Sequence, residues 1–378
     1  MFQTFKYPFC DECIAKTYDS KGMFSMNKQE LYNLIGKVAD CMMHLDAGDF
    51  KEVCPVSNID IDKWEWPQGL GMYALYRYYK VSGRDEILRW LLAWYDRHLE
   101  KGLPAKNINT TVPLLALSYL YEHNPNPKYL EVIGEWAEAI MHEFPRTEEG
   151  GFQHSGSGID YLYGQLWDDT LVMTGLFLGR AGMLLNKKEY ISECERQFLV
   201  HTKYLCDTKT GLWYHGWTFG GRHNFSKAFW GRGNCWISFA IADLLDFEGI
   251  SDSVRQFLQG VLYSQVKTLK EYQAENGMWH TLLDDPDTYV ESSGTAGIGY
   301  GILKGVRMGY LPEEYREVGK KAVQGICERI TEKGAVLDVS YGTNVGESLE
   351  EYKNIPLCVM PYGQALAILL LSEAEFVL

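Results

Sequence analysis

Two kinds of helical pattern alternate along the 378-residue chain, and this alternation constrains the fold more than any other feature. Segments of the first kind are amphipathic, with a charged face and an apolar stripe at helical spacing. The most regular one, 83–101, carries its stripe on Ile87, Leu88, Leu91, Leu92, Tyr95 and Leu99. The same pattern recurs in five further segments: 27–45, 126–144, 188–206, 251–273 and 312–332.

Segments of the second kind are rich in small residues, nearly uncharged and apolar almost all round. Six of them alternate with the first kind: 69–79, 110–121, 170–185, 235–247, 295–306 and 363–374. A helix that is apolar on all sides must be buried on most of its surface. The alternation therefore predicts an all-α fold, an (α/α)6 barrel with six inner helices inside six outer ones. We expect one domain over residues 1–378, with roughly the first 25 residues as an extension.

The remaining strand and turn signals lie in loops that precede the inner helices. These loops are 148–158, 210–225, 276–294 and 338–346. In a barrel of this kind they gather at one end. Because function tends to lie on loops held by a rigid scaffold, that end is the expected site.

Composition limits the partners. The formal net charge is −14, which argues against nucleic acid and anionic membranes, so a few local cations must capture any anionic substrate. The 11 Trp, 25 Tyr and 16 Phe suit either a helical core or a sugar-binding cleft. The sequence carries no indication of oligomeric state.

The cysteines and the N-terminal sequence bear on location. Nine cysteines include a lone CxxC pair, Cys10 and Cys13. No second pair stands at zinc spacing, so free thiols in a reducing compartment are favoured over a metal or redox site. The N-terminus has no apolar signal region, and no stretch approaches the length of a membrane span. We expect a soluble, cytoplasmic protein without metal or cofactor.

The densest polar cluster is Gln165–Thr170, at the mouth of an inner helix, where Asp168 and Asp169 are adjacent. An Asp before an apolar run is a common helix cap. Two carboxylates suggest more: one can cap the helix and stay solvated while the other points into the cavity. A carboxyl desolvated near Trp167 and a like charge would hold its proton more tightly, as a general acid requires.

Two further clusters follow along the chain. His215 lies among aromatic residues in a Gly-bounded loop, and could serve as a ligand contact or as a structural histidine. Arg232 stands between two glycines at the start of a buried helix. There a guanidinium beside an electropositive helix terminus would clamp a carboxylate, the alternative being a structural ion pair.

These clusters occur in an order that resembles glycoside hydrolase family 105, the unsaturated rhamnogalacturonyl and glucuronyl hydrolases, which are related to family 88. The resemblance runs from about residue 60 to the C-terminus. It is carried by seven motifs: WPQGLGMYALYRYYKVSG at 66–83, NTTVPLLAL at 109–117, GGFQH at 150–154, QLWDDTLVM at 165–173, TGLWYHGW at 210–217, WGRGNCW at 230–236 and ESSGTA at 291–296.

The resemblance implies roles for particular residues. Asp169 matches the general acid/base of the family, and Asn109 stands where some members carry a second Asp, so it would orient substrate or water. The residues implied to contact the unsaturated uronic acid are Trp66, His154, Trp167, His215, Arg232 and Trp236.

The implied reaction removes a 4,5-unsaturated uronic acid from the non-reducing end of an oligosaccharide that a polysaccharide lyase has released. Asp169 would protonate C4 and then activate the water that adds at C5, so one carboxyl suffices. The source could be pectic rhamnogalacturonan, ulvan or a glycosaminoglycan. Two alternatives use the same barrel: a sugar epimerase with His215 and His280 as paired bases, and a non-catalytic sugar-binding protein.

Overall fold

The structure, a computed structural model, describes residues 26–46, 48, 59–155 and 162–377. The expected N-terminal extension and Cys10, Cys13 and Cys54 lie outside the described residues. No helix in the described part of the chain is long and apolar enough to cross a membrane.

Helices dominate the described residues, and they fall at the twelve predicted places. The outer helices are α1 (Lys28–Met43), α3 (Asp85–Lys101), α6 (Pro127–His142), α8 (Lys188–Leu205), α10 (Asp252–Glu271) and α12 (Arg316–Cys327), the last preceded by the short 3-10 turn η3 (Glu313–Tyr315). The inner helices are α2 (Trp66–Ser82), α4 (Ile108–Thr111) with α5 (Pro113–Leu120), the π-helical turn η2 (Leu171–Gly175) with α7 (Leu176–Leu184), α9 (Gly231–Leu244), α11 (Ser292–Arg307) and α14 (Pro361–Ala374).

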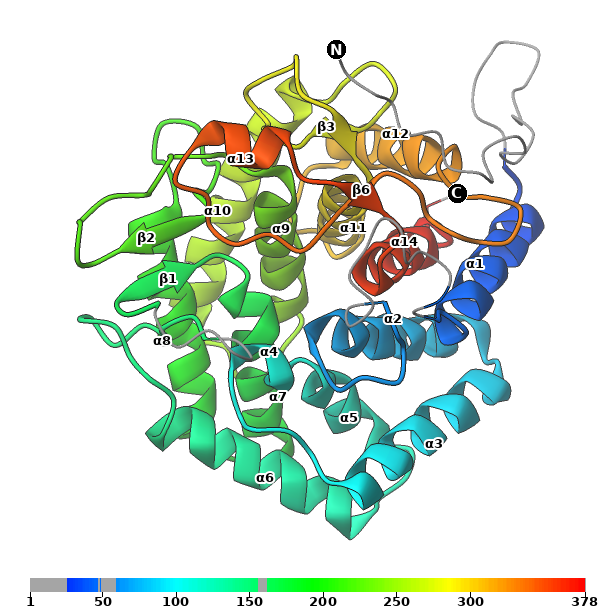
Figure 1. The fold of residues 1–378 in the computed structure, drawn as a ribbon, viewed down its shortest axis with the longest axis vertical. Helices are drawn as coiled ribbons and strands as arrows, with labels where there is room; N and C mark the ends of the chain where they lie inside the picture. The colour runs from blue at the N-terminus through cyan, green and yellow to red at the C-terminus, as the bar shows by residue number, and fades with distance from the viewer. Residues whose placement is uncertain (1–25, 47, 49–58, 156–161, 378) are drawn as a thin grey trace.

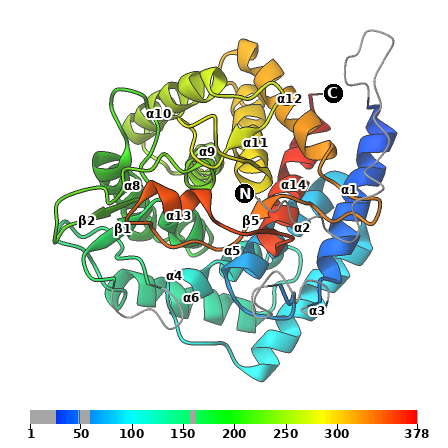
Figure 2. The same ribbon diagram turned by 45° about the horizontal axis from the view of Figure 1, so that its top comes forward.

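The inner helices form a closed ring. Helix α2 contacts α5, α5 contacts α7, and α7 contacts α9; α9 then contacts α11, α11 contacts α14, and α14 returns to α2. Each outer helix covers one inner neighbour, as α8 covers α7 and α12 covers α11. Figures 1 and 2 show the inner helices enclosed by the outer ones, which confirms the predicted (α/α)6 barrel as a single domain.

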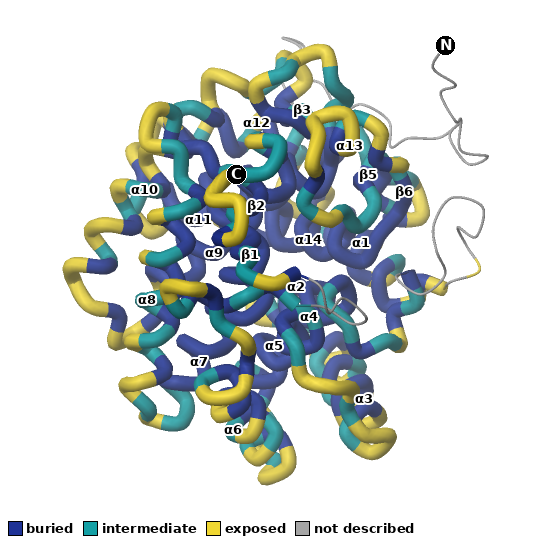
Figure 3. Tube along the Cα trace, turned by 60° about the vertical axis from the view of Figure 1, so that its left-hand side comes forward, coloured by how far each residue is buried: buried dark blue, intermediate teal, exposed yellow. Residues whose placement is uncertain are grey.

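Burial follows the two sequence patterns. Every residue of α9 and of α14 is buried, whereas the outer helices bury one stripe and expose the other. Figure 3 shows this contrast, with exposed residues along α3, α6 and α10 and buried chain at the centre. Glycine permits the close packing of the inner ring: a Cβ on Gly301 of α11 would lie 2.6 Å from the backbone of Ser238 in α9.

Two inner helices depart from the predicted single runs. The second is interrupted between α4 and α5, because Pro113 lacks the N–H that would continue the hydrogen-bond ladder. The third opens with the π-helical turn η2 directly after Asp169 and Thr170. Such turns are rare and occur frequently at functional sites.

The loops that precede the inner helices are joined by three short antiparallel sheets. They pair β1 (Gln165–Trp167) with β2 (Gly216–Thr218), β3 (Trp279–His280) with β4 (Val290–Glu291), and β5 (Val339–Ser340) with β6 (Leu357–Cys358). The short helix α13 (Leu349–Lys353) lies in the loop before α14. In the first sheet Trp167 pairs with Gly216, which brings the loops of Asp169 and His215 together.

Candidate active site

A cleft of about 740 Å³ opens at the loop end of the barrel. Most of the residues predicted from the sequence line it: Trp66, Asn109, His154, Trp167, Asp169, Arg232 and Trp236. They come from four different inner helices or the loops before them, and the barrel alone brings them together. A cleft of this size suits a ligand of a few rings.

Asp169 lies in this cleft and is 7% exposed. Its Oδ1 atom is 3.2 Å from Nδ1 of His154, which is also 3.1 Å from Oγ1 of Thr170. Burial acts to raise the pKa of Asp169, but the nearby histidines, His154 foremost, together outweigh burial, and the pKa is lowered. His154 is held in turn by stacking on Trp167, with ring centroids 4.0 Å apart and planes 9° apart.

Asp168 corrects one expectation. It is fully buried rather than solvated, and it does not cap the helix, because the third inner helix begins at Thr170 without a side-chain cap. The side chain lies against Gly233, where a Cβ would come within 2.2 Å of Asp168 Oδ2. Burial, and then the adjacent Asp169, raise the pKa of Asp168 well above its ordinary value. The tightly held proton therefore belongs to Asp168 and not to the carboxyl in the cleft.

Arg232 is the second residue of α9 and is 1% exposed. Its Nη1 donates to the carbonyl and hydroxyl of Ser340, and its Nη2 donates to the carbonyl of Tyr341 at 2.9 Å. The guanidinium also stacks over the rings of Trp230 and Tyr362. No ion pair with Arg232 is found among the described residues, so the alternative of a structural ion pair gains no support there; Arg232 lines the cleft, and its charge also acts on the buried Asp168.

Two tryptophans stand beside this arginine. Trp66 stacks on Tyr362 at 4.7 Å and meets Trp236 edge-on at 6.3 Å. Asn109 lies opposite, at the start of α4, where Asn107 caps the helix by accepting from the N–H of Thr110. The Oδ1 atom of Asn109 is buried and has no hydrogen-bond partner among the described residues.

His215 does not line the cleft in this structure. It is 2% exposed and lies behind Trp167, with its ring 4.2 Å from that of Trp230 and Nδ1 2.8 Å from the hydroxyl of Tyr352. Burial lowers its pKa to about 3, so the ring is neutral near pH 7. The sequence suggested that His215 contacts a ligand directly. In the structure His215 instead packs behind the indole of Trp167, which lines the cleft. His280, the other histidine considered for an epimerase, is also absent from the lining, because its Nδ1 is bound to the carbonyl of Thr288.

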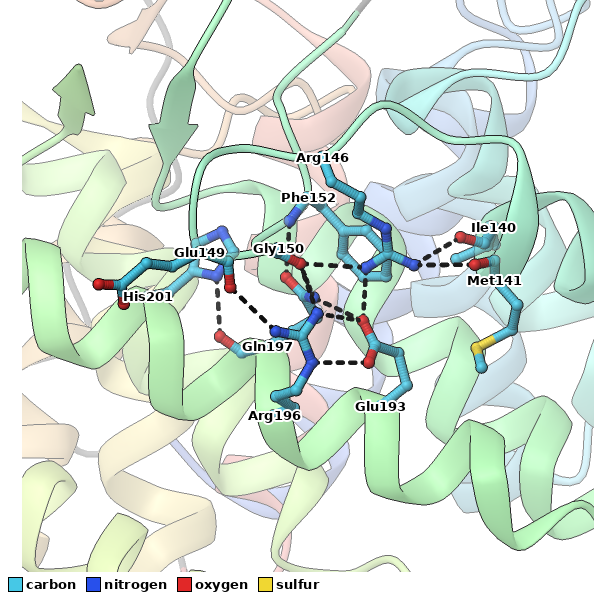
Figure 4. Close-up of polar contacts among 10 residues, drawn as sticks. All are labelled: Ile140, Met141, Arg146, Glu149, Gly150, Phe152, Glu193, Arg196, Gln197 and His201. Atoms are coloured by element: carbon cyan, nitrogen blue, oxygen red, sulfur yellow. Dashed lines mark hydrogen bonds and ion pairs between the residues drawn. The ribbon is translucent and has the colours of Figure 1, made fainter. Parts of the chain in front are cut away.

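The loop that carries His154 is fastened to α8 by a polar network (Figure 4). Gln197 is fully buried, and its side chain accepts from the N–H of Phe152 and donates to the carbonyl of Gly150. Arg196 donates to the same carbonyl. This network holds residues 150–152 and so places His154 two residues further on.

The sequence did not identify several residues of the cleft. They are Lys63, Glu65, Lys101, Met173, Tyr341, Thr343 and Asn344, with others of the segments 62–65 and 101–104. Only 341–344 falls in a loop that the sequence marked as functional. Within the described residues, no group of three His, Cys, Asp or Glu side chains could hold a metal ion.

A helical barrel whose loop end holds a carboxyl, a buried arginine and several indoles in one cleft is the architecture of a carbohydrate-active enzyme. The chain belongs to glycosyl hydrolase family 88, whose pattern matches residues 35–378. It is 34% identical over 312 residues to the unsaturated rhamnogalacturonyl hydrolase YesR of Bacillus subtilis (strain 168), which covers 82% of this chain and 89% of that protein.

Solved structures agree with this assignment. A possible member of family GH105 from Salmonella enterica serovar Paratyphi A is 40% identical, with a TM-score of 0.89 over 95% of this chain and 98% of that one. A family 105 glycoside hydrolase of C. acetobutylicum, 24% identical, shares the fold with a TM-score of 0.78 over 92% of this chain and 99% of that one. The chain is thus a glycoside hydrolase of the group formed by families 88 and 105.

Proposed function

We propose that the protein removes a 4,5-unsaturated uronic acid from the non-reducing end of an oligosaccharide, with Asp169 as the single acid/base. The observation that carries the proposal is the pairing, within one cleft, of Asp169 and the cation of Arg232. A sugar that bears a carboxylate and an electron-rich double bond requires a cation to bind the carboxylate and an acid to protonate the double bond. The Bacillus subtilis relative, an unsaturated rhamnogalacturonyl hydrolase, supports the same substrate class.

Binding of the unsaturated sugar rests on Arg232 and the indoles. The substrate carboxylate would approach the guanidinium, which forms no ion pair with an acidic side chain of the described residues, and a charge-assisted hydrogen bond there is strong. Trp66, Trp167 and Trp236 offer apolar walls for the flat ring. His215 acts behind Trp167 as a positioning residue, and Asn109 offers an amide to a hydroxyl or to water.

The chemistry needs one carboxyl. Protonated Asp169 gives its proton to C4, and the resulting cation at C5 is shared with the ring oxygen. Water then adds to C5 and loses a proton to the Asp169 carboxylate, which restores the acid. The hemiketal at C5 opens, and the C1 hemiacetal that follows releases the leaving sugar as an alcohol. One water is consumed, and C1 is never attacked directly.

The low pKa of Asp169 in the free enzyme fits this cycle. A carboxylate with a lowered pKa serves well as the base for water. Filling the cleft removes solvent from Asp169 and brings the substrate carboxylate near it, and both changes raise the pKa of the carboxyl. Substrate binding thereby favours the protonated form that the first step requires.

Loss of the ultraviolet absorbance of the conjugated C4=C5–carboxylate tests the proposal, because neither an epimerase nor a binding protein destroys that chromophore. Turnover in H₂¹⁸O with immediate borohydride trapping distinguishes the mechanism. The label should enter at C5, whereas direct hydrolysis would place it at C1. A chain that leaves the chromophore of every lyase-generated disaccharide intact would refute the proposal.

We also propose that the enzyme works in the cytoplasm on small anionic oligosaccharides. The thiols of Cys194, Cys206, Cys235 and Cys327 are free, and the cytoplasm keeps thiols reduced. Cell fractionation tests the location.

A further inference from the structure

The cleft extends beyond the residues assigned to the unsaturated sugar. Two segments, 62–65 before α2 and 101–104 at the end of α3, also line the cleft, and we call the part that they line its outer end. None of these residues has a role in the reaction proposed above. Leu103 and Pro104 give this end an apolar strip, and Lys63 and Lys101 give it two amines.

The two segments are held together as one wall. The indole of Trp64 packs 5.6 Å from the ring of His98 and donates its N–H to the carbonyl of Thr110 at 2.8 Å. The indole N–H of Trp94, on α3, donates to the carbonyl of Ile61. Lys63 adjoins Trp64, and Lys101 follows His98 by three residues on the same helix face, so both amines flank this aromatic contact.

The acidic and the basic side chains of this wall differ in whether they have interaction partners. Asp62 is paired with Arg97 at 2.8 Å, and Glu65 has an interaction of its own. Lys63 is half-buried and Lys101 is exposed, and neither has an ion-pair or hydrogen-bond partner among the described residues. In a protein with a net charge of −14, two unpaired amines that line one cleft are not explained by the general surface.

We propose that the outer end of the cleft is a second anion site, which binds a sulfate ester or carboxylate on the leaving sugar through Lys63 and Lys101. The inference rests on the function proposed above, because the uronic acid at Asp169 leaves only the rest of the oligosaccharide to reach this wall. An ammonium group acts as a mobile point charge, which suits an anion whose position varies between substrates. The preferred substrates are then those that carry a second negative charge.

The test compares three unsaturated disaccharides whose leaving sugar is neutral, sulfated or carboxylated. The variants are Lys63→Gln, Lys101→Gln and the double variant. Lys106→Gln is the matched control, because Lys106 lies in the same connection but outside the cleft lining, with Nζ on the carbonyl of Glu135. Each is assayed by loss of ultraviolet absorbance at low and at physiological salt.

The wild-type enzyme should show the higher kcat/KM on the charged substrates, and added salt should reduce that preference. Each lysine variant should lose about two- to fivefold on the charged substrates, mainly through KM, and nothing on the neutral one. Loss on only the sulfated or only the carboxylated substrate supports the site with the narrower ligand. Equal losses on all three substrates, or none, refute it. Failure of the wild type on every substrate refutes the proposed function itself.

Discussion

Replacing Asp169 by Asn removes the proposed proton donor and keeps the shape of the side chain. Asn is nearly isosteric with Asp, and Oδ1 of Asp169 has only the 3.2 Å approach of His154 Nδ1. The fold should therefore survive. Proton transfer by a positioned side chain contributes about 10²–10⁴-fold. Because the proposed mechanism uses Asp169 for both protonation and water activation, the loss should reach the upper part of this range, about 10³–10⁴-fold.

In activation free energy this loss is about 4–5.5 kcal/mol. The assay follows the ultraviolet absorbance of one unsaturated disaccharide, with circular dichroism to establish folding. Asp168→Asn is the matched comparison, because its carboxyl is next in sequence but faces Gly233 and not the cleft. We expect it to retain far more turnover. A folded Asp169→Asn enzyme with near-normal turnover would refute the reasoning, and the reverse ranking would move the acid to Asp168.

Three further predictions follow from the same contacts. Asp168→Asn should remove a pH dependence of stability, because burial raises the pKa of Asp168 in the folded state. The protonated carboxyl stabilises the fold fully below about pH 4, the pKa of Asp in an unfolded chain. This contribution is lost as the pH rises through the raised pKa of the folded state. The melting temperature of this variant should thus gain on wild type between pH 4 and 8, and a parallel offset would contradict this. Arg232→Lys should raise KM for an unsaturated uronide about tenfold or more, because a point charge does not reproduce the planar fork stacked on Trp230; a lower melting temperature with unchanged KM would reduce Arg232 to an anchor of the 340–341 loop. Gln197→Ala leaves the buried N–H of Phe152 without its acceptor, which costs about 1–3 kcal/mol of unfolding free energy, and should lower kcat through His154; denaturant unfolding and kinetics measure both effects.

Local pattern was sufficient for the architecture. The alternation of all-apolar and amphipathic segments reports burial directly, because a helix that exposes its whole apolar surface to water is unstable. The closed ring follows from this pattern, because six helices that are apolar on all sides bury one another fully only when the last, α14, packs against the first, α2. Pro113 itself indicates the break between α4 and α5, although we expected one continuous helix over 110–121.

The chemistry of the adjacent carboxyls was decided by tertiary structure. In sequence, Asp168 and Asp169 are equivalent members of one motif. Only the packing of β1 against β2 and α9 buries Asp168 beside Gly233 and turns Asp169 toward His154, so their pKa values move in opposite directions.

The same holds for side chains that reach the cleft from distant loops. Motif position made His215 a ligand contact, whereas its loop places it behind Trp167. Lys63 and Lys101 carry no local signal, and they share a wall because Trp64 packs on His98. Helical periodicity records which face of a helix is buried, but where a loop side chain points depends on contacts with residues far along the chain. The sequence alone therefore determined the barrel and the loop end at which the cleft opens, and the packing of those loops decided which residues line the cleft.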